Sequence, residues 1–240
     1  MKPITKPNIS VIVFAMVFPF LFTLLYFQWL APVGGLAQQI AYGMGKTIQF
    51  ALPIFWFGVI CREKWWIRPF HRRGLWHGIL FGLLVFAVMV VLYHFWFKLP
   101  GRPLAADSAA VGAIRNKLTN IGFGTPLLFL LLGAFYSLIH SGLEEYYWRF
   151  FVCGFSARMW GWPFAIFLSS VGFTLHHIVL LCNFFGYDNP WAYFLSLCVG
   201  VGGAVWAYLY WKSDSIWGPW FSHAVIDMAI FVVGYDILFQ

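Results

Sequence analysis

Residues 141–149 read Ser-Gly-Leu-Glu-Glu-Tyr-Tyr-Trp-Arg, and they place two carboxylates and a guanidinium inside an apolar, aromatic helix. A charged side chain in a membrane span costs about 2.5 to 3.5 kcal/mol on insertion scales, so these groups require partners or a hydrated cavity. Glu145 and Arg149 stand four residues apart and are predicted to pair on one face of the helix. Glu144 points about 100° away and must face another element. The segment is therefore a candidate functional site.

The composition indicates a membrane protein built from helices. Of the 240 residues, 62% are hydrophobic and 10% are charged, which is more apolar surface than a soluble domain of this length can bury. The aromatic content of 22% fits belts at the two membrane surfaces. The net charge of +7 does not indicate nucleic acid, because the basic residues lie in loops where membrane orientation explains them. The four cysteines have no metal-ligand spacing and are expected to be packing residues.

Seven apolar segments are long enough to cross a bilayer, so we predict an all-α, polytopic transmembrane bundle of about seven spans. The first segment is too long for the core of a signal peptide and is interpreted as a retained span. Residues 1–125 are expected to hold N-terminal spans and an interfacial segment, and residues 126–240 the transmembrane core that contains the candidate site, with both parts forming one integrated domain. The predicted spans cover residues 8–30, 36–61, 75–96, 126–155, 163–183, 191–211 and 217–238.

Two features of the N-terminal part leave alternatives open. Lys46 lies within the second span, where it is either a snorkelling or paired structural residue or part of a polar cavity. The segment 100–124 carries apolar residues at helical spacing, which predicts an eighth, amphipathic helix on the membrane surface. This helix is either a connector or a gate for substrate. Its apolar residues are Val111, Ile114, Leu118 and Ile121.

The basic residues predict the orientation of the spans, because cytoplasmic loops carry an excess of Lys and Arg. With the N-terminus inside, ten Lys and Arg fall on the cytoplasmic side and four fall outside. The densest basic stretch, residues 62–73, then lies in the cytoplasm. The inner positions are 2, 6, 62, 64, 68, 72, 73, 149, 158 and 212, and the outer positions are 98, 102, 115 and 117.

Four proton-active groups on three predicted spans can meet at one depth. Glu144 lies in the fourth span, His177 in the fifth, and His223 and Asp227 stand one turn apart in the seventh. Such a set can hold a water molecule, with a carboxylate as general base and an imidazole as donor to a developing oxyanion. Any one of these residues is equally well explained as a structural contact between helices. The combination is what indicates catalysis.

Three motifs carry a resemblance to a known family. They are Glu144-Glu145-x-x-x-Arg149, Phe173-x-x-x-His177 and His223-x-x-x-Asp227, in this order and each within a predicted span. The segment 208–223, which leads into the last histidine, adds support. Over about residues 126–238 the chain resembles the CPBP family. This family comprises type II CAAX prenyl endopeptidases and bacterial relatives that include bacteriocin-processing and self-immunity proteins.

The resemblance implies a glutamate-dependent intramembrane peptidase with four catalytic residues. Glu144 would be the general base that activates water, and His177 would bind and position that water. His223, together with Asp227, would stabilise the tetrahedral oxyanion. The prenyl endopeptidases carry Asn at the position of Asp227, and an ionised Asp cannot donate a hydrogen bond. Asp227 therefore either stays protonated or orients His223.

The resemblance also implies supporting residues around this set. Arg149 and Glu145 would hold the site in shape, and Phe173 belongs to the second motif. His140, four residues before Glu144, could support the general base. His176 adjoins the favoured histidine of the second motif but faces about 100° away from it on a helix.

The predicted function is hydrolysis of a peptide bond in a membrane-associated or lipidated protein or peptide, such as a CAAX-like terminus, a leader or a C-terminal anchor. No cofactor is expected, a metal ion is left open, and the oligomeric state is not determined. The alternatives are a non-catalytic membrane regulator or immunity protein on the same fold and a metal-dependent membrane hydrolase. We expect an integral protein of the bacterial or archaeal cell (inner) membrane with a cytoplasmic N-terminus.

Overall fold

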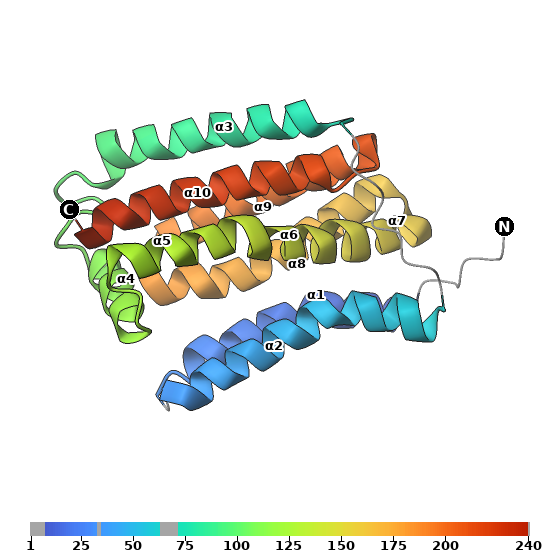
Figure 1. Cartoon of the computed structure of the whole chain (residues 1–240), viewed down its shortest axis with the longest axis horizontal. Helices are drawn as coiled ribbons and strands as arrows, with labels where there is room; N and C mark the ends of the chain where they lie inside the picture. Colours follow the sequence, from blue (N-terminus) through green and yellow to red (C-terminus); the bar gives the residue numbers. More distant parts are fainter. Residues whose placement is uncertain (1–7, 33–34, 63–71, 240) are drawn as a thin grey trace.

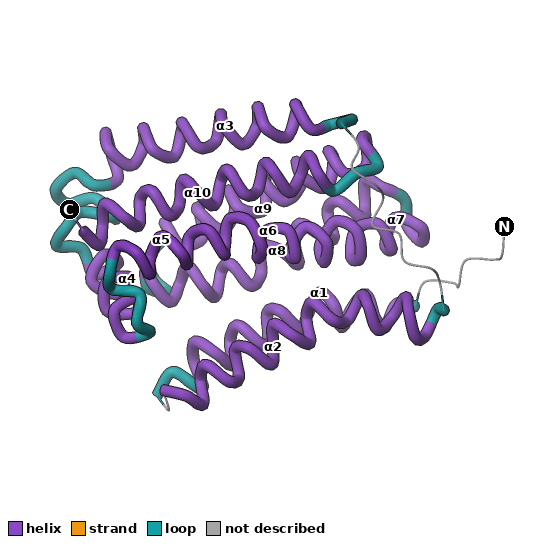
Figure 2. Tube along the Cα trace, in the orientation of Figure 1, coloured by secondary structure: helices purple, strands orange, loops and turns teal. Residues whose placement is uncertain are grey.

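The computed structural model describes residues 8–32, 35–62 and 72–239, and within these ranges the chain forms helices joined by short loops (Figure 2). Seven helices in these ranges are long and apolar enough to cross a membrane. The predicted all-α bundle of about seven spans is therefore confirmed. The spans are Ile9–Trp29, Gly35–Ile60, Leu75–Phe97, Pro126–Trp160, Trp162–Phe185, Pro190–Ser213 and Trp217–Phe239.

In the first four spans, the α-helices are followed by shorter π-helical segments, whereas the last three spans are uninterrupted α-helices. The α-helices are α1 Ile9–Leu24, α2 Gly35–Phe55, α3 Leu75–Leu92, α4 Ala109–Asn120, α5 Pro126–Ala134, α6 Ser141–Glu145, α7 Gly154–Trp160, α8 Trp162–Phe185, α9 Pro190–Ser213 and α10 Trp217–Phe239. The π-helical segments are Leu25–Trp29, Trp56–Ile60, Tyr93–Phe97, Phe135–His140 and Tyr146–Cys153. The fourth span joins α5, α6 and α7 through the last two of these segments.

Local sequence signals set the ends of several helices. The side-chain oxygen of Asn8 accepts a hydrogen bond from the backbone nitrogen of Ser10 at 2.8 Å and caps α1. Asn189 caps α9 in the same way, and Pro190 follows at the first helical position, where its missing N–H costs nothing. Gly161 has a φ of 78° and separates α7 from α8. A left-handed residue at this point favours glycine.

The predicted boundaries agree with the observed spans except in the fourth, which continues past Phe155 to Trp160. The predicted eighth helix is present as α4, which begins after a Ser108 cap. The Nε of Arg115 donates to the carbonyl oxygen of Ile237 at 2.8 Å and ties α4 to the end of α10. Residues 63–71 of the predicted basic connection, and the lysines at 2 and 6, lie outside the described residues.

The helices pack in layers around α8 and α10 (Figure 1). One side of α10 packs against α3, and α10 also contacts α9, the fourth span and α4. On the opposite side of the bundle, α8 packs against both α9 and α1. The α1–α2 hairpin lies at the lower edge of Figure 1, where α2 reaches the fourth span through Tyr146–Cys153. Segments from both ends of the chain therefore surround the fourth span.

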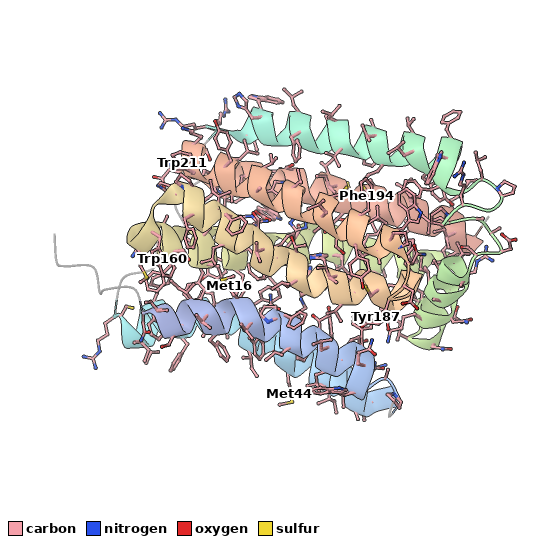
Figure 3. The ribbon with its side chains drawn as sticks, turned by 180° about the vertical axis from the view of Figure 1, so that it is seen from behind. Met16, Met44, Trp160, Tyr187, Phe194 and Trp211 are labelled. Carbon is pink, nitrogen blue, oxygen red and sulfur yellow. The ribbon has the colours of Figure 1, made fainter. Side chains whose placement is uncertain are left out.

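Large aromatic residues form the core of this bundle. Tyr147, Trp148, Phe151 and Phe155 follow one another along the fourth span and are almost completely buried. Apolar side chains also cover the outer faces, where Figure 3 labels Met44 and Phe194 among others. An apolar exterior is what a membrane requires, so the polar groups of the bundle are those that need a functional or structural explanation.

Candidate functional site

The fourth span changes its helical geometry at the predicted site. α6 contains five residues and lies between the π-helical segments Phe135–His140 and Tyr146–Cys153. Segments of π-helix occur frequently at functional sites, because the wider turn redirects the side chains that follow it. Glu144 and Glu145 are the last two residues of α6, and both are buried. The local geometry therefore aims two adjacent carboxylates into the bundle.

Glu145 and Arg149 form the predicted ion pair. The Nε of Arg149 lies 3.1 Å from Oε2 of Glu145, and both side chains have an exposed fraction of 0%. The guanidinium lies over the ring of Phe173 at 4.9 Å and over that of Trp206 at 5.4 Å. A delocalised guanidinium tolerates such aromatic faces better than an ammonium does. The pair thus joins the fourth span to α8 and α9.

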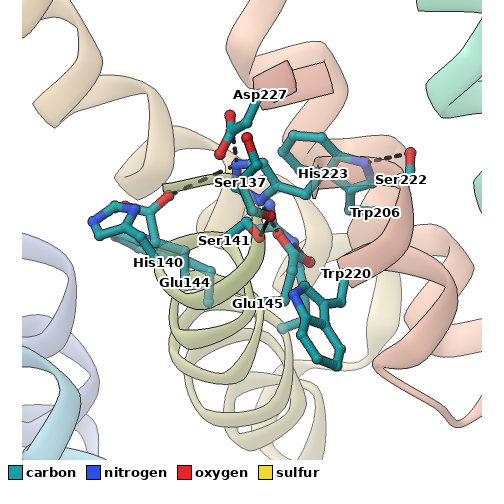
Figure 4. A network of polar contacts seen from close by, with 12 residues as sticks. Ser137, His140, Ser141, Glu144, Glu145, Trp206, Trp220, Ser222, His223 and Asp227 are labelled. Carbon is teal, nitrogen blue, oxygen red and sulfur yellow. Dashed lines mark hydrogen bonds and ion pairs between the residues drawn. The ribbon is translucent and has the colours of Figure 1, made fainter. Parts of the chain in front are cut away.

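His223 on α10 links all three carboxylates of the site (Figure 4). Its Nδ1 lies 2.9 Å from Oε1 of Glu145. Its Nε2 lies 3.9 Å from Oε2 of Glu144 and 3.6 Å from Oδ1 of Asp227. The ring is stacked on Trp206 at a centroid distance of 4.2 Å. A carboxylate acceptor on Nδ1 and an indole on the ring face fix the direction in which Nε2 points.

Glu144 faces the interior of the bundle and has a residue exposed fraction of 3%. Three basic nitrogens lie 3.8 Å from its Oε1: Nζ of Lys46, Nε2 of His140 and Nε2 of His176. These groups come from α2, from Phe135–His140 and from α8, while His223 on α10 approaches the other oxygen. The carboxylate therefore stands where four helical segments meet.

The two adjacent histidines of α8 differ in their surroundings. His176 is stacked on Trp148 with an angle of 2° between the rings and reaches Glu144. His177 is half-buried, and its Nδ1 lies 2.8 Å from the carbonyl oxygen of Phe173. A carbonyl oxygen can only accept, so Nδ1 of His177 carries the proton and Nε2 is left as an acceptor. The described basic groups within 4.0 Å of the Glu144 carboxylate are Lys46, His140, His176 and His223. His177 does not belong to this set.

Phe173 occupies the centre of the aromatic surroundings of the site. Its ring lies 5.4 Å from that of His176, 4.6 Å from that of His177 and 6.0 Å from that of His223. The same ring carries the Arg149 guanidinium on its face. Phe173 was expected to support the site. Its ring lies beside His176 and His177 of α8 and beside His223 of α10.

Sequence reasoning did not select two groups that the structure places beside Glu144. The sequence left open whether Lys46 has a structural or a functional role. Its charge within a span was the signal that favoured a functional role. His176 gave no signal that distinguished it from its neighbour. The His140 position was expected to support Glu144, and its Nε2 does lie 3.8 Å from that carboxylate.

The side chains of the site are arranged for handling protons. They provide carboxylates and imidazoles at separations of 2.9 to 3.9 Å around His223. Within the described ranges, no group of three or more His, Cys, Asp or Glu is placed so that it could hold a metal ion. Proton transfer and charge stabilisation are the chemistry that this geometry supports directly.

Residues 124–229 match the family model described as Rce1-like, type II CAAX prenyl endopeptidase Rce1-like. The predicted relation to the CPBP family is thereby confirmed. Together with the seven apolar helices, the match supports an integral membrane protein and points to a protease. All three motifs lie within the matched residues, whereas α2 and Lys46 lie outside them. Among curated proteins and among solved structures, nothing matches this chain.

Replacing Arg149 with Met should destabilise the protein strongly, because it leaves the buried Glu145 carboxylate without its cation. Removing one partner of a buried pair costs about 3 to 5 kcal/mol. We expect a large fall in the thermal unfolding midpoint of the detergent-purified protein. Arg158→Met is the matched control, since that side chain is exposed near the end of the same span. Equal unfolding midpoints for the two variants would contradict the structural role of the pair.

Proposed function

We propose that this protein is a glutamic-type intramembrane endopeptidase that hydrolyses a peptide bond in a membrane-associated or lipidated protein or peptide. The observation that carries the proposal is the position of the Glu144 carboxylate, which is buried within 4 Å of basic nitrogens from four helical segments. A buried carboxylate that neighbouring basic groups keep in its ionised form is suited to accept a proton from water. The family match supports peptide hydrolysis as the reaction class.

In the proposed reaction, Glu144 takes a proton from water while the water oxygen bonds to the carbonyl carbon of the substrate. The carbonyl π electrons move to its oxygen, and the N–H at Nε2 of a protonated His223 donates to that oxyanion. The carbon–nitrogen bond then breaks, and the proton held by Glu144 passes to the leaving nitrogen. His177 positions the water through Nε2, which is the acceptor when Nδ1 donates to Phe173.

The remaining polar residues act on His223 and not on the substrate. Glu145 accepts from Nδ1 at 2.9 Å and so fixes the orientation of the ring. Arg149 neutralises Glu145, and Asp227 lies 3.6 Å from Nε2. An ionised Asp227 can only accept, so we assign it to orienting His223 and not to donating to the oxyanion. Where the prenyl endopeptidases carry Asn, we therefore propose that Asp227 orients His223 and does not stay protonated.

The substrate class follows from where the site lies. A bond that reaches Glu144 must enter the bundle, which favours a segment already held at the membrane by a lipid or an apolar anchor. The family description names CAAX prenyl endopeptidases, so a prenylated C-terminus is the first substrate to test. Leaders of bacteriocin type and C-terminal anchors are the other members of the proposed class.

Glu144→Gln should lower the hydrolysis rate by at least about 100-fold, because the amide cannot accept the proton of water. The rate is measured with purified protein in liposomes acting on a farnesylated peptide with a CAAX terminus, by mass spectrometry of the products. Asp107→Asn makes the same carboxylate-to-amide change at an exposed position in the loop before α4 and should leave the rate unchanged.

A Glu144→Gln variant that cleaves at the wild-type rate would refute the mechanism. A variant that keeps the cellular phenotype of the wild type would favour the non-catalytic regulator instead. Native substrates are found by comparing membrane-protein termini in cells that express the wild type or Glu144→Gln. Leaders or C-termini trimmed only with the wild type are the expected result.

His177→Ala should reduce kcat by about 10- to 100-fold, while His176→Ala should reduce it by less than about 5-fold. The reason is that His177 is half-buried and can offer its acceptor nitrogen to water, whereas His176 is buried against Trp148. His176→Ala should instead lower the unfolding midpoint, since it removes the stacked ring. The reverse order of the two kcat values would assign the water-positioning role to His176.

We also propose that the protein lies in the bacterial or archaeal cell (inner) membrane with its N-terminus in the cytoplasm. Arg149 is buried in the site, so removing it from the ten inner basic residues leaves nine, still above the four outside. With the native cysteines replaced by serine, Asp107→Cys should react with an impermeant thiol reagent added to intact cells. Arg158→Cys should react only after the membrane is opened. The opposite pattern would invert the topology.

A further inference from the structure

Lys46 brings a positive charge to Glu144 from a helix outside the family-matched segment. Its Nζ lies 3.8 Å from Oε1 of Glu144, and its side chain has an exposed fraction of 20%. We propose that Lys46 is a positioning residue of the catalytic site, which makes α2 a wall of that site. This inference rests on the proposed function and names a residue that neither the motifs nor the family match include.

The helix α2 is amphipathic, and Lys46 lies on its polar face. One face of the helix bears polar side chains that are buried or half-buried. The opposite face is exposed on the bundle surface and is mostly apolar, as expected for lipid contact, with Thr47 as a polar exception. The inward side chains are Gln38, Tyr42, Lys46 and Gln49, and the outward ones include Ile40, Met44 and Ile48.

The polar face of α2 is directed at the fourth span. The hydroxyls of Tyr42 and Tyr136 are 2.8 Å apart, which joins α2 to the segment that precedes α6. One turn further along α2, Lys46 reaches Glu144, and its ammonium lies 5.4 Å from the ring centroid of Phe50. Gln49 is 1% exposed, and its Nε2 has no hydrogen-bond partner among the described residues. Polar side chains within a membrane span usually face the interior of the bundle, and they often mark a functional site.

The balance of charge explains why the site needs this lysine. Arg149 is committed to Glu145 at 3.1 Å, so its charge is compensated within the fourth span. Glu144 is a second carboxylate in the same low-dielectric surroundings, and Asp227 is a third acid close by. A lysine 3.8 Å away supplies a fixed charge that favours the ionised form of Glu144, which is the form that accepts a proton.

The charge of Lys46 also remains when the proton of water has moved to Glu144. At that point the carboxyl is neutral, and the negative charge has passed to the oxygen of the tetrahedral intermediate. The ammonium stays beside the reacting groups and stabilises this intermediate electrostatically, with no bond of its own made or broken. A neutral side chain of the same length would provide the packing but not the charge.

Lys46→Met should lower kcat by about 10- to 100-fold with KM changed less than about 3-fold, and Lys46→Arg should restore most of the rate. The substrate is the farnesylated CAAX peptide in liposomes. Thr47→Val is the control, because Thr47 is exposed on the same helix and its hydroxyl donates to the carbonyl oxygen of Gly43. Unchanged kcat in Lys46→Met, while Glu144→Gln is inactive, would overturn the role of Lys46 and leave the proposed function standing.

A second measurement tests the charge without substrate. Infrared spectra of the protein in liposomes near neutral pH should show a protonated carboxyl band in Lys46→Met that the wild type lacks. The band should disappear in the double variant Lys46→Met, Glu144→Gln. Identical spectra for the wild type and Lys46→Met would overturn the proposal. Activity retained by Glu144→Gln would instead refute the proposed function, so the two failures are distinguishable.

Discussion

The structure depends on keeping three carboxylates inside an apolar bundle without leaving any of them uncompensated. Charges in a medium of low dielectric are stable only when they are paired and hydrogen-bonded. Glu145 meets this condition through Arg149 and His223, and all three side chains are buried. Once that unit is in place, α10 is tied to the fourth span, and Nε2 of His223 is directed towards Glu144. The geometry of the site thus follows from the need to neutralise its supporting acid.

Aromatic packing converts this electrostatic unit into a rigid one. Trp206 stacks on His223 and also donates from its indole nitrogen to the Ser222 hydroxyl at 3.0 Å, so the histidine has few alternative orientations. On the other side, Trp148 stacks on His176. Phe173 lies between these groups and beneath the Arg149 guanidinium. Large rings lose little conformational entropy for the area they bury, which suits them to hold polar groups in a membrane interior.

The α1–α2 hairpin gives the site a component that the matched segment does not contain. The match covers residues 124–229, yet the ammonium of Lys46 on α2 lies as close to Glu144 as the histidines His140 and His176 do. The hairpin therefore does more than cover the spans of the matched segment with apolar surface. Its polar inner face and lipid-facing outer face make it part of the site and part of the membrane boundary at once.

The sequence alone determined the spans, because about twenty predominantly apolar residues form a helix long enough to cross the bilayer core. It also determined the Glu145–Arg149 pair, since four residues along a helix bring two side chains together whatever surrounds them. The approach of His176 to Glu144 was decided by the tertiary structure. Adjacent helical residues differ by about 100°, and the rotation of α8 is set by packing, such as that of Gly172 against the Trp148 ring. The contact of Lys46 was likewise decided by how α2 docks, because no local rule relates residues a hundred positions apart.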